Sequence, residues 1–300
     1  DSLLKFVPEN GCPDPYVINV SDSLVIIAMD SEWWLFPYNK NNKDADCNCA
    51  TSRDVLATLR ELLYKNRYKT ILLATHHPFK SYGTHGGYFN WKEHIFPLTD
   101  LYKNLYLPLP VVGSLYPLMR KTFPGTEDLR HPLYKDMINS VDEVFKAFPN
   151  IIHVSGHEHG LQLIVDSSKR FTQIISGGGA KENYTFKGTH SLFAQQGAGF
   201  VTVDILQSNR LIFTYYTYTN NTLNQSYRYT WKPQPYKAAE DSTYQAITSD
   251  SVVAAAHPSY KNVSGIHQFL FGKNYRTAWA TPAKLPVIRV SEIYGGLQQE

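Results

Sequence analysis

Apolar runs alternate with polar turns over the first two thirds of the chain, and their lengths predict strands. Residues 16–20 and 24–29 are two such runs, separated by the turn Ser21-Asp22-Ser23, and they predict adjacent strands. The run 24–29 is continuously apolar, which is typical of a strand buried on both faces of a sheet, and residues 69–75 predict another buried strand. Residues 151–154 form a fourth apolar run.

Two stretches have helical periodicity instead. In residues 52–66 the apolar positions form one stripe, consisting of Val55, Leu56, Leu59, Leu62 and Leu63. Thr51 or Ser52 can cap this helix, and residues 133–148 predict a second one. Because a strand, a helix and another strand follow one another here, we expect a right-handed crossover and a mostly parallel sheet.

The later part of the chain predicts antiparallel strands at 161–165, 171–176, 200–206 and 211–218. From about Asn220 the sequence becomes polar and irregular. We therefore predict an α/β fold with a division into residues 1–220, the main domain, and residues 221–300, a linker and connector to a further module.

Composition narrows the class of protein. With 43% hydrophobic residues the chain can bury a core, and a net charge of +3 with no basic run gives no support for nucleic-acid binding. The low share of charged residues, 18%, and the 21 tyrosines suit an extracytoplasmic protein. In an oxidising compartment Cys12 could bridge to Cys47 or to Cys49, stabilising the fold by about 3–4 kcal/mol, and three free thiols are the alternative.

Histidines follow two of the buried strands. His76 comes directly after the strand 69–75, with His85 close behind it, and His157 and His159 come after the strand 151–154. In extended chain His157 and His159 would face one side and Glu158 the other. Neutral imidazole binds zinc and iron, so the set indicates a hydrolytic metal site. Three histidines suit a site with one zinc ion. A site with two ions needs bridging carboxylates, and Asp30 is the only acidic residue that clearly follows a predicted strand. The sequence therefore leaves the number of metal ions open.

Two of these motifs carry a family resemblance. Thr75-His76-His77-Pro78 followed by His85, and Gly156-His157-Glu158-His159-Gly160 followed by the glycines at 177–179, resemble the calcineurin-like metallophosphoesterases, in particular the small purple (tartrate-resistant) acid phosphatases. The resemblance covers about residues 10–220. It implies a β-sandwich flanked by helices and two metal ions of the iron, zinc or manganese class.

The same resemblance implies a role for each histidine. His76 and His157 would bind one metal ion and His159 the other. His85 would contact the phosphate and protonate the leaving group, while His77 would be a variable position and not a ligand. The family's Asp-x-His, Gly-Asp and Gly-Asn-His motifs are absent from the chain, so we expect the N-terminal half of the domain, and the activity that depends on it, to need residues upstream of Asp1.

Residues 272–279 are similar to the connector of bacterial surface proteins in which such a phosphoesterase precedes an outer-membrane β-barrel. The sequence thus predicts a metal-dependent phosphomonoesterase outside the cytoplasm, acting on a phosphorylated small molecule and not on nucleic acid. Two alternatives remain open: an inactive surface binding or assembly module beside a barrel, and a mononuclear zinc hydrolase. Two metal ions per chain would indicate the phosphomonoesterase, one ion would indicate the zinc hydrolase, and no ion would indicate the binding module.

Overall fold

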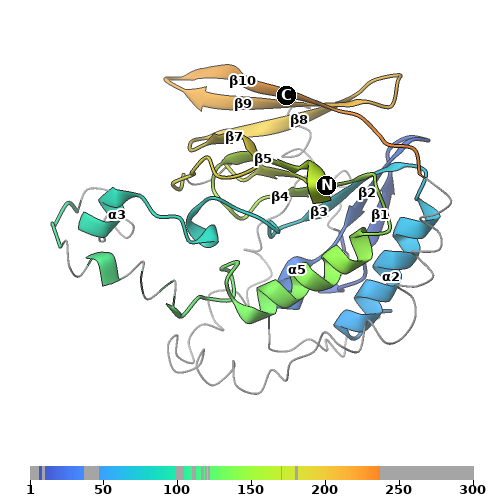
Figure 1. Cartoon of the computed structure of the whole chain (residues 1–300), viewed down its shortest axis with the longest axis horizontal. Coiled ribbons are helices and arrows are strands. Elements are labelled where there is room, and N and C mark those ends of the chain that lie inside the picture. Colours follow the sequence, from blue (N-terminus) through green and yellow to red (C-terminus); the bar gives the residue numbers. More distant parts are fainter. Residues whose placement is uncertain are drawn as a thin grey trace, which may run out of the picture.

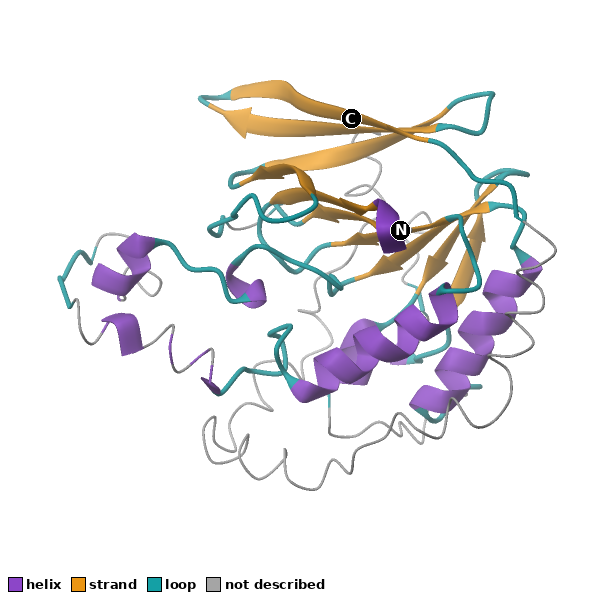
Figure 2. Cartoon of the chain, in the orientation of Figure 1, coloured by secondary structure: helices purple, strands orange, loops and turns teal. Residues whose placement is uncertain are grey.

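The chain folds into three layers, two β-sheets and a layer of helices (Figures 1 and 2). The computed structural model describes residues 7–8, 11–36, 47–96, 98, 105–109, 113–115, 118, 120, 122–169, 171–179 and 182–236. The layers confirm the expected mixed α/β sandwich flanked by helices. Residues 237–300, which include the predicted connector, lie outside the described residues.

The large sheet has seven strands in the order β1-β2-β3-β4-β6-β5-β7. They are β1 (Tyr16–Asn19), β2 (Leu24–Ala28), β3 (Thr70–Thr75), β4 (Ile151–Ser155), β5 (Leu161–Asp166), β6 (Phe171–Ser176) and β7 (Ser191–Gln195). The central strands β2, β3, β4 and β6 are parallel, and β1, β5 and β7 pair antiparallel with their neighbours. The carboxyl ends of β2, β3 and β4 therefore meet at one edge, where ligands gather in sheets of this kind.

The small sheet is an antiparallel meander of β8 (Gly199–Ile205), β9 (Leu211–Thr219) and β10 (Thr222–Trp231). Its Phe213 and Tyr215 belong to the same buried cluster as Leu72 and Ile152 of the large sheet, so the two sheets enclose one core. The expected boundary at residue 220 falls in the turn of the β9–β10 hairpin. Residues 222–231, expected to be irregular, form a strand instead.

Helices α2 (Ser52–Lys65) and α5 (Pro132–Phe145) cover the other face of the large sheet (Figure 1). Leu59 and Met137 from these helices are fully buried in a second cluster with Leu73 of β3. Thr51 and Asp54 form a reciprocal capping box at the start of α2. The shorter elements are α1 (Ser31–Leu35), α3 (Trp91–Ile95) and the 3₁₀ turns η2 (Thr84–Gly86) and η4 (Ser167–Lys169).

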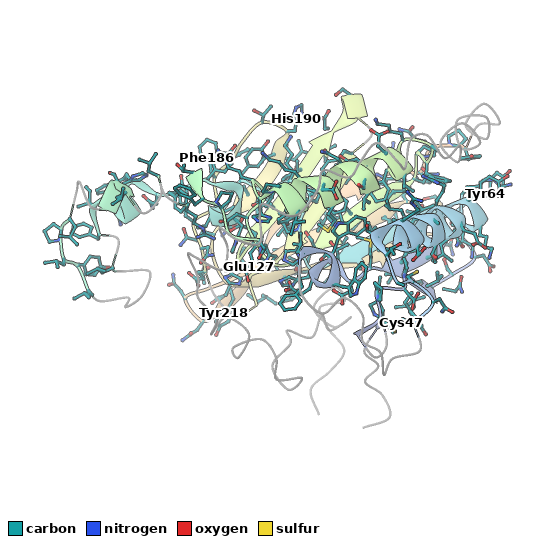
Figure 3. The ribbon with its side chains drawn as sticks, turned by 90° about the horizontal axis from the view of Figure 1, so that it is seen from below. Cys47, Tyr64, Glu127, Phe186, His190 and Tyr218 are labelled. Carbon is teal, nitrogen blue, oxygen red and sulfur yellow. A yellow bond between two sulfur atoms is a disulfide. The ribbon has the colours of Figure 1, made fainter. Side chains whose placement is uncertain are left out.

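A disulfide joins Cys12 to Cys47, which is the first of the two pairings that the sequence left open. Cys47 is labelled in Figure 3. Cys49 is a buried free thiol, with its Sγ 3.4 Å from Thr58 Oγ1. Within the described part of the chain, none of the helices combines the length and the apolar character needed to cross a membrane.

Candidate metal centre

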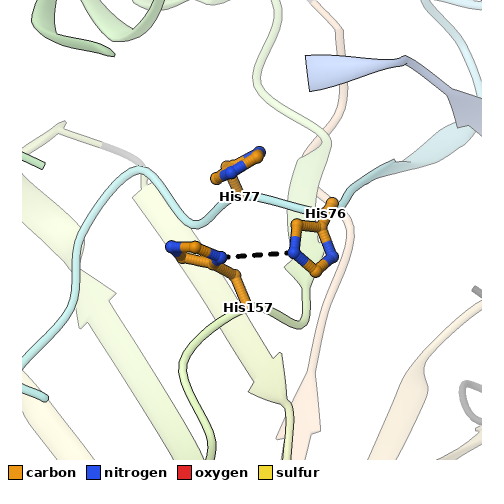
Figure 4. A group of neighbouring side chains, drawn as sticks. All are labelled: His76, His77 and His157. Atoms are coloured by element: carbon orange, nitrogen blue, oxygen red, sulfur yellow. Dashed lines mark hydrogen bonds between the residues drawn. The ribbon is translucent and has the colours of Figure 1, made fainter. Parts of the chain in front are cut away.

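The candidate site lies at the edge where the parallel strands β3 and β4 end side by side. Thr75 and Ser155 are partners at the last position of the pair, so the residues that follow them leave the sheet together. His76 and His77 follow β3, and Gly156 and His157 follow β4. A main-chain bond from Gly156 N–H to the His76 carbonyl, 3.1 Å, ties the two loops. Figure 4 shows the three imidazoles that result.

His76, His77 and His157 form a group in which one ring nitrogen from each lies within 4.8 Å of the others. His76 Nε2 and His157 Nδ1 are 3.2 Å apart, the contact drawn in Figure 4. His77 and His157 are buried, with 0% and 7% of their surfaces exposed. The structure brings the predicted ligands His76 and His157 together. It also places His77, which the sequence motif left outside the ligand set, inside this group.

Each of two rings is oriented by an oxygen on its far side. His157 Nε2 lies 2.9 Å from the Glu127 carbonyl oxygen, which can only accept, so Nε2 carries the proton and Nδ1 keeps its lone pair toward His76. His77 Nδ1 is 2.9 Å from Ser31 Oγ, which also accepts a bond from the His77 main-chain N–H. If Nδ1 donates to Ser31 as well, His77 Nε2 is free to act as a ligand.

All three imidazoles are held neutral. Burial, then the nearby His159 and His85, lower the pKa of His76 to about 4. Burial and neighbouring histidines keep the pKa values of His77 and His157 well below the ordinary range. Because the neutral ring is the form that binds metal, these three residues are ready to act as ligands at neutral pH.

Carboxyl groups crowd the same edge. Asp30 follows β2 and caps α1 by accepting a bond from Trp33 N–H, 3.0 Å. Glu32 Oε2 lies 3.7 Å from His77 Nε2. Burial, then the negative charges of Glu127 and Asp30, raise the pKa of Glu32 to about 7, and burial also raises the pKa of Asp30. A bound cation would relieve this repulsion, so the donor set fits a metal ion.

The two remaining predicted residues, His85 and His159, are not among these three imidazoles. His85, on η2, has its ring centroid 4.1 Å from that of His157, and its Nδ1 is 3.3 Å from Asp128 Oδ1. His159 influences His76 electrostatically but lies outside the group of three imidazoles. Sequence reasoning missed Glu32 and Glu127. Glu32 carried a signal, its position two residues after Asp30, whereas Glu127 (labelled in Figure 3) lies in a stretch without periodicity.

No protein-family model matches the chain, and no curated protein matches it. Among solved structures it is similar to GAP50, the anchor in the inner membrane complex of Plasmodium, with 15% identity and a TM-score of 0.39 over 78% of this chain and 58% of that one. It is also similar to PhoD, with 8% identity and a TM-score of 0.43 over 73% of this chain and 42% of that one. The chain thus spans about half the length of each. Likeness at these TM-scores carries no information about activity, so the function must be argued from the side chains.

Proposed function

We propose that this chain supplies the histidine ligands of a metal-dependent phosphoester hydrolase. The observation that supports it most directly is the neutral group of His76, His77 and His157 at the carboxyl edge of the sheet, in which His77 and His157 are buried. The motifs around His76 and His157 supply the reaction class, because they resemble those of the metallophosphoesterases. A bound ion of the iron, zinc or manganese class polarises phosphoryl oxygens and lowers the pKa of a bound water.

The residues divide into two ligand sets. His76, His77 and His157 offer three nitrogens for one ion. In this proposal a second ion is held by His159 and by Glu32 and Asp30, whose negative charges act on one another. The substrate in this proposal is a phosphorylated small molecule.

His85 serves in the proposal as the general acid. Its ring lies against His157, next to the metal group, and it is only 12% exposed at the side chain. As the attacking water oxygen forms its bond to phosphorus, the bond to the leaving oxygen breaks and that oxygen keeps the electron pair. The proton on Nε2 of the doubly protonated His85 ring passes to this oxygen, the ring keeps its Nδ1 proton, and one proton of the water is released to solvent.

A mononuclear zinc hydrolase is the second candidate. The group itself favours it, because three imidazoles with an open fourth position are the ligands of many single-zinc hydrolytic sites. The two candidates differ in the role of Glu32 and Asp30, which bind a metal ion only in the two-metal phosphoester hydrolase. Two ions per chain support the two-metal enzyme and one ion supports the zinc site.

The test uses the protein with any residues that precede Asp1. His76→Ala and His157→Ala should each lower the bound metal and abolish hydrolysis of p-nitrophenyl phosphate, both measured after dialysis. His94→Ala, a histidine on the short helix α3, is the matched control and should keep metal and activity. Unchanged metal content and activity in His76→Ala and His157→Ala would remove the proposal.

The disulfide supports a location outside the cytoplasm for this enzyme. The bond between Cys12 and Cys47 persists in oxidising compartments, whereas cytosolic thiols are kept reduced. Fractionation of the source cell followed by non-reducing mass analysis would test this part of the proposal. A reduced protein in the cytosolic fraction would contradict it.

A further inference from the structure

Two buried carboxylates hold His85, and neither belongs to the metal group. Asp128 contacts its ring and Glu158 contacts its main chain. We propose that Asp128 and Glu158 are positioning residues that fix the tautomer and the backbone of His85, so that Nε2 is the ring nitrogen presented to the phosphoester. This inference rests on the proposed function for its chemistry, but the orientation of His85 can be tested without any activity.

Asp128 controls the ring. Its side chain is 8% exposed, and its Oδ1 lies 3.3 Å from His85 Nδ1. Arg120 grips the same carboxylate through Nη2, 2.8 Å, and through Nε, 3.1 Å and 3.2 Å. Burial alone would raise the pKa of Asp128, but the bonds from His85 and Arg120 outweigh it and the pKa lies below the ordinary value. An ionised carboxylate can only accept, so it favours a proton on His85 Nδ1.

Arg120 offers the competing arrangement. Its Nη2 is also 3.2 Å from His85 Nδ1 and could donate to it, which would move the ring proton to Nε2. That tautomer places the Nδ1 lone pair 3.3 Å from a negatively charged oxygen. Repulsion between the two makes the Nδ1–H tautomer the favoured one, and the alternative is an outcome that the experiment can detect.

Glu158 controls the backbone. It lies in the loop after β4 between His157 and His159, and it is fully buried. Its Oε2 accepts a bond from Ser81 Oγ, 2.6 Å, and one from the His85 main-chain N–H, 3.2 Å. One carboxylate therefore links the loop that carries the metal ligands to the loop that carries His85.

The fit around Glu158 shows how closely the two loops approach. A Cβ placed on Gly83 would lie 2.1 Å from Glu158 Cδ and 2.3 Å from Oε1, far inside any normal contact. Gly83 N–H also bonds to Ser81 Oγ, 2.9 Å, the same hydroxyl that donates to Glu158. The turn before His85 is thus built onto the carboxylate, and His85 has little freedom to move its main chain.

The kinetic consequence depends on the leaving group. An alkoxide leaving group needs a proton in the transition state, whereas p-nitrophenolate does not. Asp128→Asn and Glu158→Ala should therefore lower kcat for an alkyl phosphate by about 10²-fold or more and kcat for p-nitrophenyl phosphate by less than tenfold. A defect in folding or metal binding would lower both rates equally.

Matched variants separate position from charge. Glu158→Gln keeps the shape and an oxygen that can accept the Ser81 and His85 bonds, so it should restore most of the alkyl phosphate activity that Glu158→Ala loses. Asp204→Asn makes the same chemical change as Asp128→Asn at an exposed site on β8 and should leave both rates unchanged. Metal content, measured on every variant, should match that of the wild type.

The decisive readout is the His85 ring itself. Long-range ¹H–¹⁵N correlation spectra of the metal-free wild-type protein, assigned by His85→Gln, should show the Nδ1–H tautomer, and Asp128→Asn should shift it toward Nε2–H. An Nε2–H ring in the wild type, or equal losses on both substrates, would overturn the positioning role. A wild type that binds no metal and cleaves neither ester refutes the proposed function alone, because the tautomer still decides this inference.

Discussion

His153 on β4 makes the fold sensitive to acid. The residue is fully buried, and burial lowers its pKa to about 3, outweighing the bond to Gln173, which raises it. Its Nδ1 lies 3.1 Å from Gln173 Oε1, and its Nε2 lies 2.8 Å from Thr75 Oγ1. In the unfolded chain the same ring has its ordinary pKa of 6.5. Acid therefore favours the unfolded state, in which His153 binds a proton that it does not bind in the folded state.

The size of the effect follows from these two values. Because the folded-state pKa is depressed, the stabilisation is fully present above pH 6.5 and is lost as the pH falls toward 3. Each unit of difference corresponds to about 1.4 kcal/mol. Between pH 7 and pH 4.5 the free energy of unfolding should fall by about 2–3 kcal/mol through His153 alone.

Urea denaturation of the metal-free protein at pH 7 and at pH 4.5 measures this loss. The comparison is with His153→Gln, which cannot take up the proton and should lose about 2–3 kcal/mol less over the same interval. The other buried histidines titrate in both proteins, so their contributions cancel in the difference. His94→Gln should behave as the wild type does. Equal losses in the wild type and in His153→Gln would refute the reasoning.

Three further expectations concern packing and thiols. Gly83→Ala should destabilise the protein by about 1–3 kcal/mol, because the new methyl group meets the buried Glu158 carboxyl, and adding Glu158→Ala should relieve part of that loss in a double-mutant cycle. Cys12→Ser should lower the free energy of unfolding by about 3–4 kcal/mol, because it removes a disulfide between residues 35 positions apart. Adding Cys47→Ser should lower the free energy of unfolding little further. If the losses of the two single variants added up in the double variant, the disulfide would be contradicted. Cys49 should resist iodoacetamide at pH 8 in the folded protein, because burial raises its pKa to about 11, and mass analysis showing rapid labelling would contradict this.

The helices and strands of the chain could be predicted from the sequence where the apolar positions are uniformly buried. The apolar runs of β2 and β3 and the stripe on α2, apart from the partly buried Leu62, are buried in the structure as their patterns predict, because each faces a core on at least one side. Strand β10 was missed because most of its residues are exposed, which leaves no apolar run. Its signal was the turn: Asn220 and Asn221 have φ of 50° and 58°, the left-handed pair that a two-residue hairpin needs.

The candidate site could be predicted in part, because two of its histidines directly follow predictable strands. His76 and His157 follow parallel strands, so their meeting follows from the order of the sheet. His77 could not be placed by the same argument, since its position depends on Ser31, which lies 46 residues away. Glu127 contributes a main-chain oxygen and a charge from a stretch with no periodic pattern. Contacts of this kind depend on tertiary packing and leave no local trace in the sequence.

Alternation along a strand fails at the motif that carries the site. It predicts that His157 and His159 share a face and that Glu158 points away from both. Strand β4 ends at Ser155, however, and His157 has φ of 61°, so the chain turns sharply before Glu158. The turn separates His159 from the three imidazoles and directs the Glu158 carboxylate beneath Gly83. A change in the backbone at His157 must therefore move a proposed metal ligand and the support of His85 together.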